Sequence, residues 1–494
     1  MKTTNASSPS RKTLKKPPAT TAKSSSKPPL GMLCSSAAGI DIASREHWVC
    51  VPENRATPNV RKFGTFTCDL YAIAAWLQEC GVTTVAMEST GVYWIPLFQV
   101  LEARGFTVCL VNAKHLKNVS NRPKSDRLDC QWLQRLHAYG LLMASFRPPE
   151  QLCHLRTLLR HRDAIIRASA RHVQHMQKAL HQMNLMLDTV ITDITGVTGQ
   201  QIIQAILAGE RNPTVLAGYR DYRVRASEER IAKALEGTYQ EEHVFVLQHA
   251  YAAYQFARQQ IAACDQAVER ALKRLDKTLD ATQTPLPPSP TAPRIPPHNA
   301  PTYDARTYVY EVYGVDLTQV PGFQASTIQT LLAEVGCDMN KWPTDKHFTS
   351  WLGLAPNVNR SGGKDKSAST RKVNSRAALA LRQAARAAGR SHSYLGAYYR
   401  RLRARCGPPK AITATARKLA VIFYYMVKRG AEYQELGEEY YLKRSAQRQV
   451  RRLKQQARRL GFQVSPLPPD AHDTKTQKCA HEGGTRVTKT PSAP

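Results

Sequence analysis

The stretch that most constrains the fold is residues 36–112, where short apolar runs alternate with amphipathic segments. Three closely spaced runs, residues 39–43, 47–51 and 60–66, indicate strands that pair antiparallel. Two later strands are indicated at residues 83–89 and 106–112, and helical periodicity precedes each, at residues 69–81 and 92–105. Strand–helix–strand units add parallel strands to a sheet. The pattern therefore predicts an α/β domain with a mixed sheet.

Four acids stand out along this part of the chain. Asp41 interrupts the first apolar strand, where a carboxylate costs several kcal/mol unless it is paired, hydrogen-bonded or bound to a cation. Glu88 ends the strand at residues 83–89. Asp126 and Asp129 follow Ser125, a good N-cap, and share one face at the start of a predicted helix. Taken singly, Glu88 could be a turn residue and Asp126 a carboxylate favoured by the helix dipole.

A hairpin meander followed by βαβ units is the layout of ribonuclease-H-like nuclease folds. In such folds the first strand and a neighbouring strand end at one edge of the sheet, and a later helix lays its acids against that edge. Asp41, Glu88, Asp126 and Asp129 would then converge, and hard divalent cations would neutralise them. Two Mg²⁺ ions about 4 Å apart, or Mn²⁺ in their place, would polarise a phosphodiester and stabilise the entering and leaving oxygens.

The charge balance predicts a polyanionic partner. The 494 residues include 70 Lys and Arg against 38 Asp and Glu, a formal net charge of +32. Each cation placed against a phosphate releases condensed counterions, so we expect nucleic-acid binding. Eleven scattered cysteines with no CxxC pair indicate reduced thiols of a cytoplasmic protein. No run of about 18 apolar residues is present, and no membrane span is expected.

The chain divides into six predicted parts. Residues 1–35 form a basic, disordered arm, residues 36–150 the α/β domain, and residues 151–283 a polar helical region. In that region Leu152, Leu155, Leu159, Ile166, Val173 and Leu180 form a near-heptad stripe, which predicts a long helical hairpin or coiled-coil arm for spacing or dimerisation. A Pro-rich linker at 284–301 precedes a mainly helical domain at 302–440, and a basic helix with a disordered tail occupies 441–494.

A second group of candidate residues lies in the C-terminal domain. Pro321 and Gly322 resemble the turn of a helix-hairpin-helix, whose free amides can face a phosphate. Ser361 precedes Gly362, Gly363 and Lys364, so a hydroxyl stands beside flexible backbone and a cation. By chemistry alone this loop is either a phosphate contact or the carrier of a nucleophile. Ser367, Ser369 and Thr370 are rivals for that role.

Several motifs in order carry a family resemblance: GIDIA, MESTGVYW, VNAKHLKNV, KSDRLDCQWL, VPGF, STIQTLLAEVG and FTSWLGLAPNVNRSGGK. Over residues 36–150 and 315–435 the chain resembles the DEDD insertion-sequence transposases of the IS110 family, relatives of the Piv invertases. The resemblance implies a RuvC-like N-terminal domain and a C-terminal transposase domain joined by a coiled coil. It also implies that Asp41, Glu88, Asp126 and Asp129 are the metal-binding acids and that Ser361 is the nucleophile.

The same resemblance implies a reaction. Family members cut one DNA strand at a time through a covalent serine–DNA link, and many use a noncoding bridge RNA to choose donor and target. We therefore expect three kinds of partner: DNA, a bridge RNA, and further copies of the chain in a dimer or tetramer joined through the coiled-coil arm. The expected location is the cytoplasm of a bacterium, at its nucleoid. Residues expected to contact nucleic acid are Lys124, Arg127, Gly322, Arg360, Gly362, Gly363, Lys364, Arg371 and Lys372. Two alternatives are a metal-only junction nuclease, in which Ser361 merely holds phosphate, and a nonenzymatic nucleic-acid scaffold.

Overall fold

The computed structural model describes residues 32–112, 125–289, 298–357, 359–362, 364–367 and 369–465. The chain divides into two compact units, residues 1–147 and 148–494. The predicted division into six parts stays a prediction.

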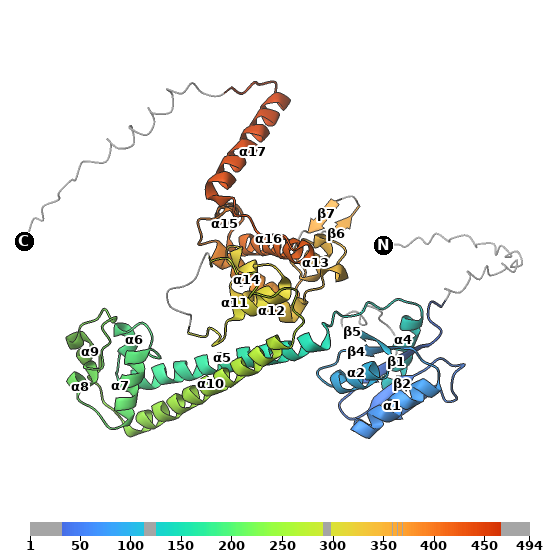
Figure 1. The fold of residues 1–494 in the computed structure, drawn as a ribbon, viewed down its shortest axis with the longest axis horizontal. Helices are drawn as coiled ribbons and strands as arrows, with labels where there is room; N and C mark the ends of the chain where they lie inside the picture. The colour runs from blue at the N-terminus through green and yellow to red at the C-terminus, as the bar shows by residue number, and fades with distance from the viewer. Residues whose placement is uncertain are drawn as a thin grey trace, which may run out of the picture. The chain divides into compact units, whose positions relative to one another are not determined.

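The first unit is built on a five-stranded sheet with the order β3-β2-β1-β4-β5 (Figure 1). Its strands are β1 (Ala37–Ile42), β2 (His47–Cys50), β3 (Val60–Phe63), β4 (Thr84–Glu88) and β5 (Thr107–Val111). β1, β2 and β3 pair antiparallel, whereas β4 pairs parallel to β1 and β5 parallel to β4. The predicted mixed sheet is confirmed, with a meander followed by parallel additions.

The two faces of this sheet are covered differently. α1 (Thr67–Glu79) and α2 (Trp94–Ala103) pack on one face, where Ile40, Ile73, Val85, Met87, Leu97 and Leu101 belong to one buried cluster. α4 (Asp126–Ala138) packs on the other face, where Cys130 is buried with Cys50 and Val60. Because successive residues of a strand point to opposite faces, Ile40 faces α1 and α2 while Asp41 faces α4.

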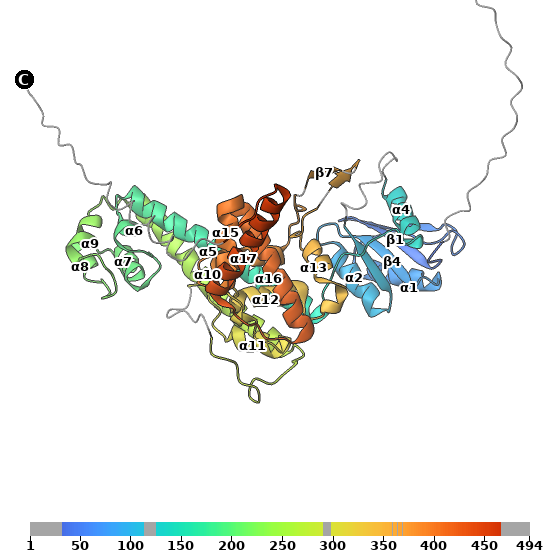
Figure 2. The same cartoon turned by 90° about the horizontal axis from the view of Figure 1, so that it is seen from above.

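The second unit begins with two 33-residue helices, α5 (Glu150–Gln182) and α10 (Glu241–Lys273), which lie side by side in Figures 1 and 2. In the predicted stripe Leu152, Leu155 and Leu180 are buried and the other three residues are half-buried. A second line continues from Leu155 at intervals of seven, with Arg162, Ser169, Met176 and Met183 all buried. This second line includes a buried ion pair, in which Arg162 Nε donates to Asp265 Oδ1 at 2.5 Å. A long helical pair is therefore present, and its supercoiling stays a prediction.

Between α5 and α10 the chain forms four short helices, α6 (Leu187–Val190), α7 (Val197–Leu207), α8 (Pro213–Ala217) and α9 (Glu228–Ala234). They share one core with the adjoining ends of α5 and α10, and in it Ile202, Ile203, Ile206 and Leu216 are inaccessible to solvent. The sequence predicted only an irregular segment here, because Gly196, Gly199 and Pro213 interrupt the helical pattern. The interruptions mark helix boundaries instead of an unstructured loop.

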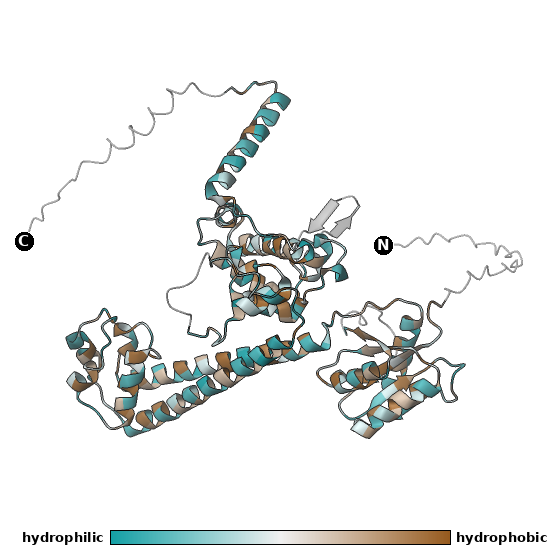
Figure 3. Cartoon of the chain, viewed as in Figure 1, coloured by the Kyte–Doolittle hydropathy of each residue, from teal (hydrophilic) through white to brown (hydrophobic). Residues whose placement is uncertain are grey.

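The C-terminal part of the second unit is mainly helical, as predicted. Its α-helices are α11 (Ala305–Tyr313), α12 (Ala325–Val335), α13 (Asp345–Trp351), α14 (Arg376–Ala388), α15 (Tyr394–Cys406), α16 (Pro408–Arg429) and α17 (Gly437–Arg459). Two 3₁₀ turns, η1 (Leu317–Gln319) and η2 (Met339–Lys341), and a hairpin of β6 (Asn359–Ser361) and β7 (Lys364–Ser367) complete it. Figure 3 shows apolar faces on α12 and α16 and a mostly hydrophilic α17.

Hydrogen bonds hold the described ends of the Pro-rich segment against other residues of the second unit. Before the gap, Arg306 Nη2 donates to the carbonyl of Pro287 at 2.6 Å. After it, Arg162 Nη2 donates to the carbonyl of Asn299 at 3.2 Å, and the amide of Thr302 donates to Asp265 Oδ2 at 3.2 Å. In the described residues no helix is long and apolar enough to cross a membrane.

Candidate active site

The strand register brings two of the four predicted acids to one edge of the sheet. Ile40 of β1 lies opposite Met87 of β4 in a parallel pair. The next residues, Asp41 and Glu88, therefore lie side by side at the carboxyl ends of neighbouring strands. Both side chains are half-buried. Glu88 Oε1 accepts a hydrogen bond from Thr90 Oγ1 at 3.2 Å. The predicted convergence of the first strand and a neighbouring strand is therefore present.

The course of α4 brings its first turn to the same edge. Gln134 Nε2 donates to the carbonyl of Ala37 at 3.2 Å, and His137 Nε2 lies 2.8 Å from Thr84 Oγ1, so the C-terminal half of α4 lies at the beginning of β1 and β4. Because the helix runs antiparallel to these strands, its N-terminus lies where they end. Asp126 and Asp129 occupy that first turn.

Gly39 sets how closely α4 approaches the sheet. A Cβ atom at this position would lie 2.3 Å from the Gln134 amide nitrogen and 2.4 Å from the Cys130 carbonyl oxygen. Only glycine admits the helix backbone at this distance. Ser125 fixes where the helix begins, because its Oγ accepts from the Leu128 amide at 3.3 Å. The position of the two helix acids thus depends on one glycine and one cap.

A pair of buried thiols, Cys50 and Cys130, lies on the same face of the sheet as Asp41. Hydrogen bonding with Cys50 raises the pKa of the Cys130 thiol, and burial and the negative charge of Asp41 add to the effect. The same hydrogen bond lowers the pKa of Cys50. The influence of Asp41 on Cys130 agrees with a carboxylate on the α4 face of the sheet. Sequence reasoning missed this thiol pair, although the alternation of residues along 47–51 puts Cys50 on one face with Trp48.

The acids share an edge, but their side chains do not close around one point. Within the described ranges, no three His, Cys, Asp or Glu side chains lie close enough together to hold a single metal ion. Asp126 is exposed, whereas Asp129 is half-buried. The donor set is nevertheless all carboxylate oxygen, which suits a hard divalent cation such as Mg²⁺ or Mn²⁺. The residues present therefore fit such a metal.

The predicted nucleophile lies at a hairpin turn in the second unit. Ser361 ends β6 and pairs with Lys364 of β7, and Gly362 between them has φ +59°. A Cβ atom on Gly362 would meet no atom within 4 Å, so the turn is open on that side. Positive φ at the turn requires the permissive backbone of glycine. The strands were not predicted, and they hold Ser361 and Lys364 opposite each other on the backbone.

The predicted nucleic-acid contacts are distributed as follows. Lys124 and Gly363 lie outside the described residues, and for Arg360 and Lys364 the structure describes the backbone in β6 and β7. Arg127 and Lys372 are exposed. Arg371 is also exposed, and its Nη2 donates to the carbonyl of Ser350 at 2.5 Å. These placements leave the predicted contacts as predictions.

Gly322 has a structural role that the sequence did not indicate. It has φ +93°, and a Cβ atom there would lie 2.3 Å from the Ala384 carbonyl oxygen of α14. The glycine therefore lets the turn before α12 pack on the α14 backbone. Its predicted contact with phosphate stays a prediction.

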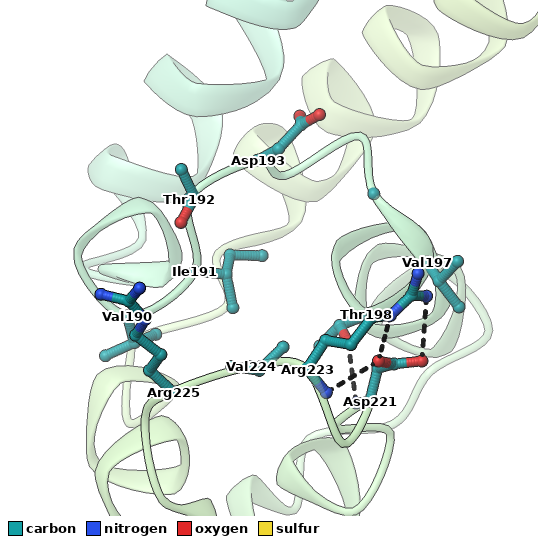
Figure 4. Close-up of a pocket in the computed structure, with 11 residues that line it drawn as sticks. Val190, Ile191, Thr192, Asp193, Val197, Thr198, Asp221, Arg223, Val224 and Arg225 are labelled. Atoms are coloured by element: carbon teal, nitrogen blue, oxygen red, sulfur yellow. Dashed lines mark hydrogen bonds and ion pairs between the residues drawn. The ribbon is translucent and has the colours of Figure 1, made fainter. Parts of the chain in front are cut away.

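A pocket of about 480 Å³ lies among the short helices between α5 and α10 (Figure 4). Asp221 and Arg223 form an ion pair on one side of it, with Nε and Oδ1 2.8 Å apart, and this contact lowers the pKa of Asp221. Arg225 lies on the other side. The sequence did not indicate this pocket, since its residues come from loops and the ends of α6 and α7, with no recognisable motif.

Comparison with protein families identifies the class to which this fold and site belong. A family of DEDD transposases, described as "Transposase", matches residues 38–185, which include all four acids and the sheet except its first residue, Ala37. The chain is thus a DNA transposase. The "Transposase IS116/IS110/IS902 family" matches residues 316–400, which include Ser361. The protein belongs to the IS110 family of insertion-sequence transposases. Among curated proteins no similar sequence was found.

Proposed function

We propose that the protein cuts and rejoins DNA strands with a serine nucleophile and divalent metal. The observation that supports this most is the meeting of β1, β4 and the first turn of α4 at one edge, each with an acid. Asp41, Glu88, Asp126 and Asp129 would hold two Mg²⁺ ions, for which Mn²⁺ could substitute. When bound, such ions polarise a phosphodiester and neutralise charge that develops on its oxygens.

Ser361 would attack the phosphorus of one DNA strand. Its Oγ forms a new P–O bond as the P–O bond to a deoxyribose oxygen breaks. A general base takes up the serine proton, and the leaving deoxyribose oxygen gains a proton and becomes a free hydroxyl. The number of phosphoester bonds is unchanged, so a free DNA hydroxyl can reverse the step on another strand without ATP. The open backbone at Gly362 supports this role, because a strand can approach the hydroxyl closely.

Target choice would be delegated to base pairing with a noncoding bridge RNA. The chain has a formal charge of +32, which suits a protein that holds two kinds of nucleic-acid backbone. The acids and Ser361 lie in different compact units, and several copies of the chain, joined through the α5–α10 pair as a coiled coil, would act together. The reaction would take place on DNA in the bacterial cytoplasm.

A strand-cleavage and strand-joining assay tests the proposal. It uses the full chain, Mg²⁺, RNA transcribed from the flanks of the coding region, and duplex DNA carrying the element ends. Asp41→Ala is expected to abolish both cleavage and Mn²⁺ binding measured by calorimetry. Glu79→Ala is the matched control, since Glu79 is an exposed acid at the end of α1, on the opposite face of the sheet from α4.

The serine role is tested separately in the same assay. Ser361→Ala is expected to retain Mn²⁺ binding and to lose joining. Cleavage by Ser361→Ala at the rate of the unmodified protein would instead favour the metal-only junction nuclease. Activity of Asp41→Ala equal to that of Glu79→Ala would contradict the metal site itself.

A further inference from the structure

The C-terminal helix α17 carries a concentrated positive charge outside both segments that match the transposase families. Between Tyr440 and Ser465 the chain has eight Lys and Arg and no Asp or Glu. All eight are exposed: Lys443, Arg444, Arg448, Arg451, Arg452, Lys454, Arg458 and Arg459. Among the described residues, none of them forms an ion pair with an acid. In the part of the chain that the structure describes, no acidic side chain neutralises these eight cations by an ion pair.

The first two turns of α17 attach it to α15. Glu438 pairs with Arg400 at 2.7 Å, the Tyr441 ring packs edge-on against Tyr394, and Arg401 donates to Ser445 Oγ. Beyond Ser445 every residue to Arg459 is exposed except Ala457, which is half-buried. Figure 1 shows this part of α17 extending beyond α15 and α16. The helix is thus anchored at one end and open to a partner along the rest.

The cations cover one half of the helix surface. At 3.6 residues per turn they fall within an arc of about 180°, and they extend for about 24 Å along the axis from Lys443 to Arg459. The exposed apolar residues Leu442, Val450, Leu453 and Leu460 lie on the remaining side. The two kinds of side chain are therefore separated around the helix, so each face can be altered without the other.

We infer that the cationic face of α17 binds duplex DNA, lying in the major groove with cations toward both phosphate backbones. An α-helix of about 10–12 Å diameter fits the B-DNA major groove, which is about 12 Å wide, whereas the major groove of duplex RNA is too deep and narrow to admit it. The contact is to phosphates and needs no particular base sequence. The inference rests on DNA being the substrate of a transposase, and it adds a binding surface outside the proposed active site.

Fluorescence anisotropy with the full chain tests this inference. The probe is a labelled 30-base-pair DNA of random sequence, without Mg²⁺, so the result does not depend on Asp41 or Ser361. The cationic variant carries Arg448→Gln, Arg451→Gln, Arg452→Gln and Arg459→Gln; glutamine already occupies neighbouring positions of α17 and preserves the helix. We expect affinity to fall between about 10-fold and 100-fold, and the slope of log K against log salt to decrease by about three to four.

Three further variants make the result specific. An apolar-face variant, Val450→Gln with Leu453→Gln, and a variant with the four arginines changed to lysine are both expected to keep DNA affinity within about twofold. A charge-matched control removes four exposed cations elsewhere in the second unit, with Lys178→Gln, Arg225→Gln, Arg230→Gln and Lys233→Gln, and is expected to bind more tightly than the cationic variant. Circular dichroism checks that every variant keeps its helix content.

Three results would overturn the inference. Equal weakening in the charge-matched control would mean that the attraction is spread over the surface. If the cationic variant lost affinity for a duplex RNA of the same length and not for the DNA, the partner of α17 would be RNA. Weakening in the apolar-face variant alone, with a change in oligomeric state, would make α17 a contact between copies of the chain.

Discussion

Replacing Gly39 by alanine should disturb the acids without touching any of them. The added Cβ would lie 2.3 Å from the Gln134 amide nitrogen, and comfortable contact needs about 3.5 Å, so α4 must withdraw by about 1 Å. The obstructing atoms belong to the helix backbone and cannot rotate away. Forcing extra volume into such a contact costs about 1–3 kcal/mol of unfolding free energy. A shift of about 1 Å in catalytic groups can reduce the rate about 100-fold.

Urea unfolding and strand cleavage measure the two effects on the same protein. Trp48 and Trp132 lie in β2 and α4, so their fluorescence reports on the face of the sheet that α4 covers. Gly218→Ala is the control: Gly218 is exposed, has φ −61°, and its added Cβ would come no closer than 3.2 Å to another atom. Its unfolding free energy should change by less than about 0.5 kcal/mol.

Gly39→Ala is expected to lose both stability and cleavage, and excess Mg²⁺ is expected to restore part of the cleavage. Stability and cleavage equal to those of Gly218→Ala would refute this expectation, because α4 would then not depend on close contact at Gly39. If Gly39→Ala lost stability but kept full cleavage activity, strand cleavage would not depend on the exact position of α4.

Three further predictions concern other parts of the chain. Asp265→Ala should lower the unfolding free energy of the second unit by about 3–5 kcal/mol, since it leaves the Arg162 guanidinium buried without its partner, whereas Arg162→Met with Asp265→Leu should restore most of it; a urea titration of both decides. Burial raises the pKa of Asp316, but hydrogen bonds from Arg306, Thr318 and Gln319 outweigh burial and lower the pKa, so the carboxylate's stabilisation is present above the unfolded pKa of about 3.9 and lost as pH falls through the folded pKa. Asp316→Asn should therefore lower the urea midpoint at a pH of about 6 and lower it by less at a pH of about 3. An equal change of the urea midpoint at both pH values would contradict this prediction. Mixing Asp41→Ala with Ser361→Ala protein should recover joining if different copies supply the acids and the serine, and a mixture as inactive as its parts would mean that one copy supplies both.

Much of the first unit could be predicted because its signals are local. Apolar runs separated by turns gave the five strands, and the acid in β1 was recognisable because a buried strand seldom carries one. The direction of α4 was not predictable from its own residues. It follows from contacts between residues about 50 and 100 positions apart, such as His137 with Thr84 and Gln134 with Ala37.

The second unit shows where local patterns fail. A heptad stripe predicts apolar residues at the buried positions, yet Arg162 and Ser169 occupy two of them, and Arg162 is tolerated because Asp265 of the facing helix pairs with it. The β6–β7 hairpin has a polar sequence with few residues of high strand propensity, so nothing in it predicts strands. Gly322 suggested a phosphate site by its motif, and the structure explains the residue by packing on α14.

The central claim, a serine that becomes joined to DNA, is tested most directly by mapping the covalent adduct. The protein is incubated with Mg²⁺, RNA and labelled DNA, denatured, digested with protease, and analysed by mass spectrometry. We expect a nucleotide linked through phosphate to Ser361, absent from the Ser361→Ala and Asp41→Ala proteins. A linkage at Ser367, Ser369 or Thr370, or strand joining by the unmodified protein with no adduct at all, would contradict this claim.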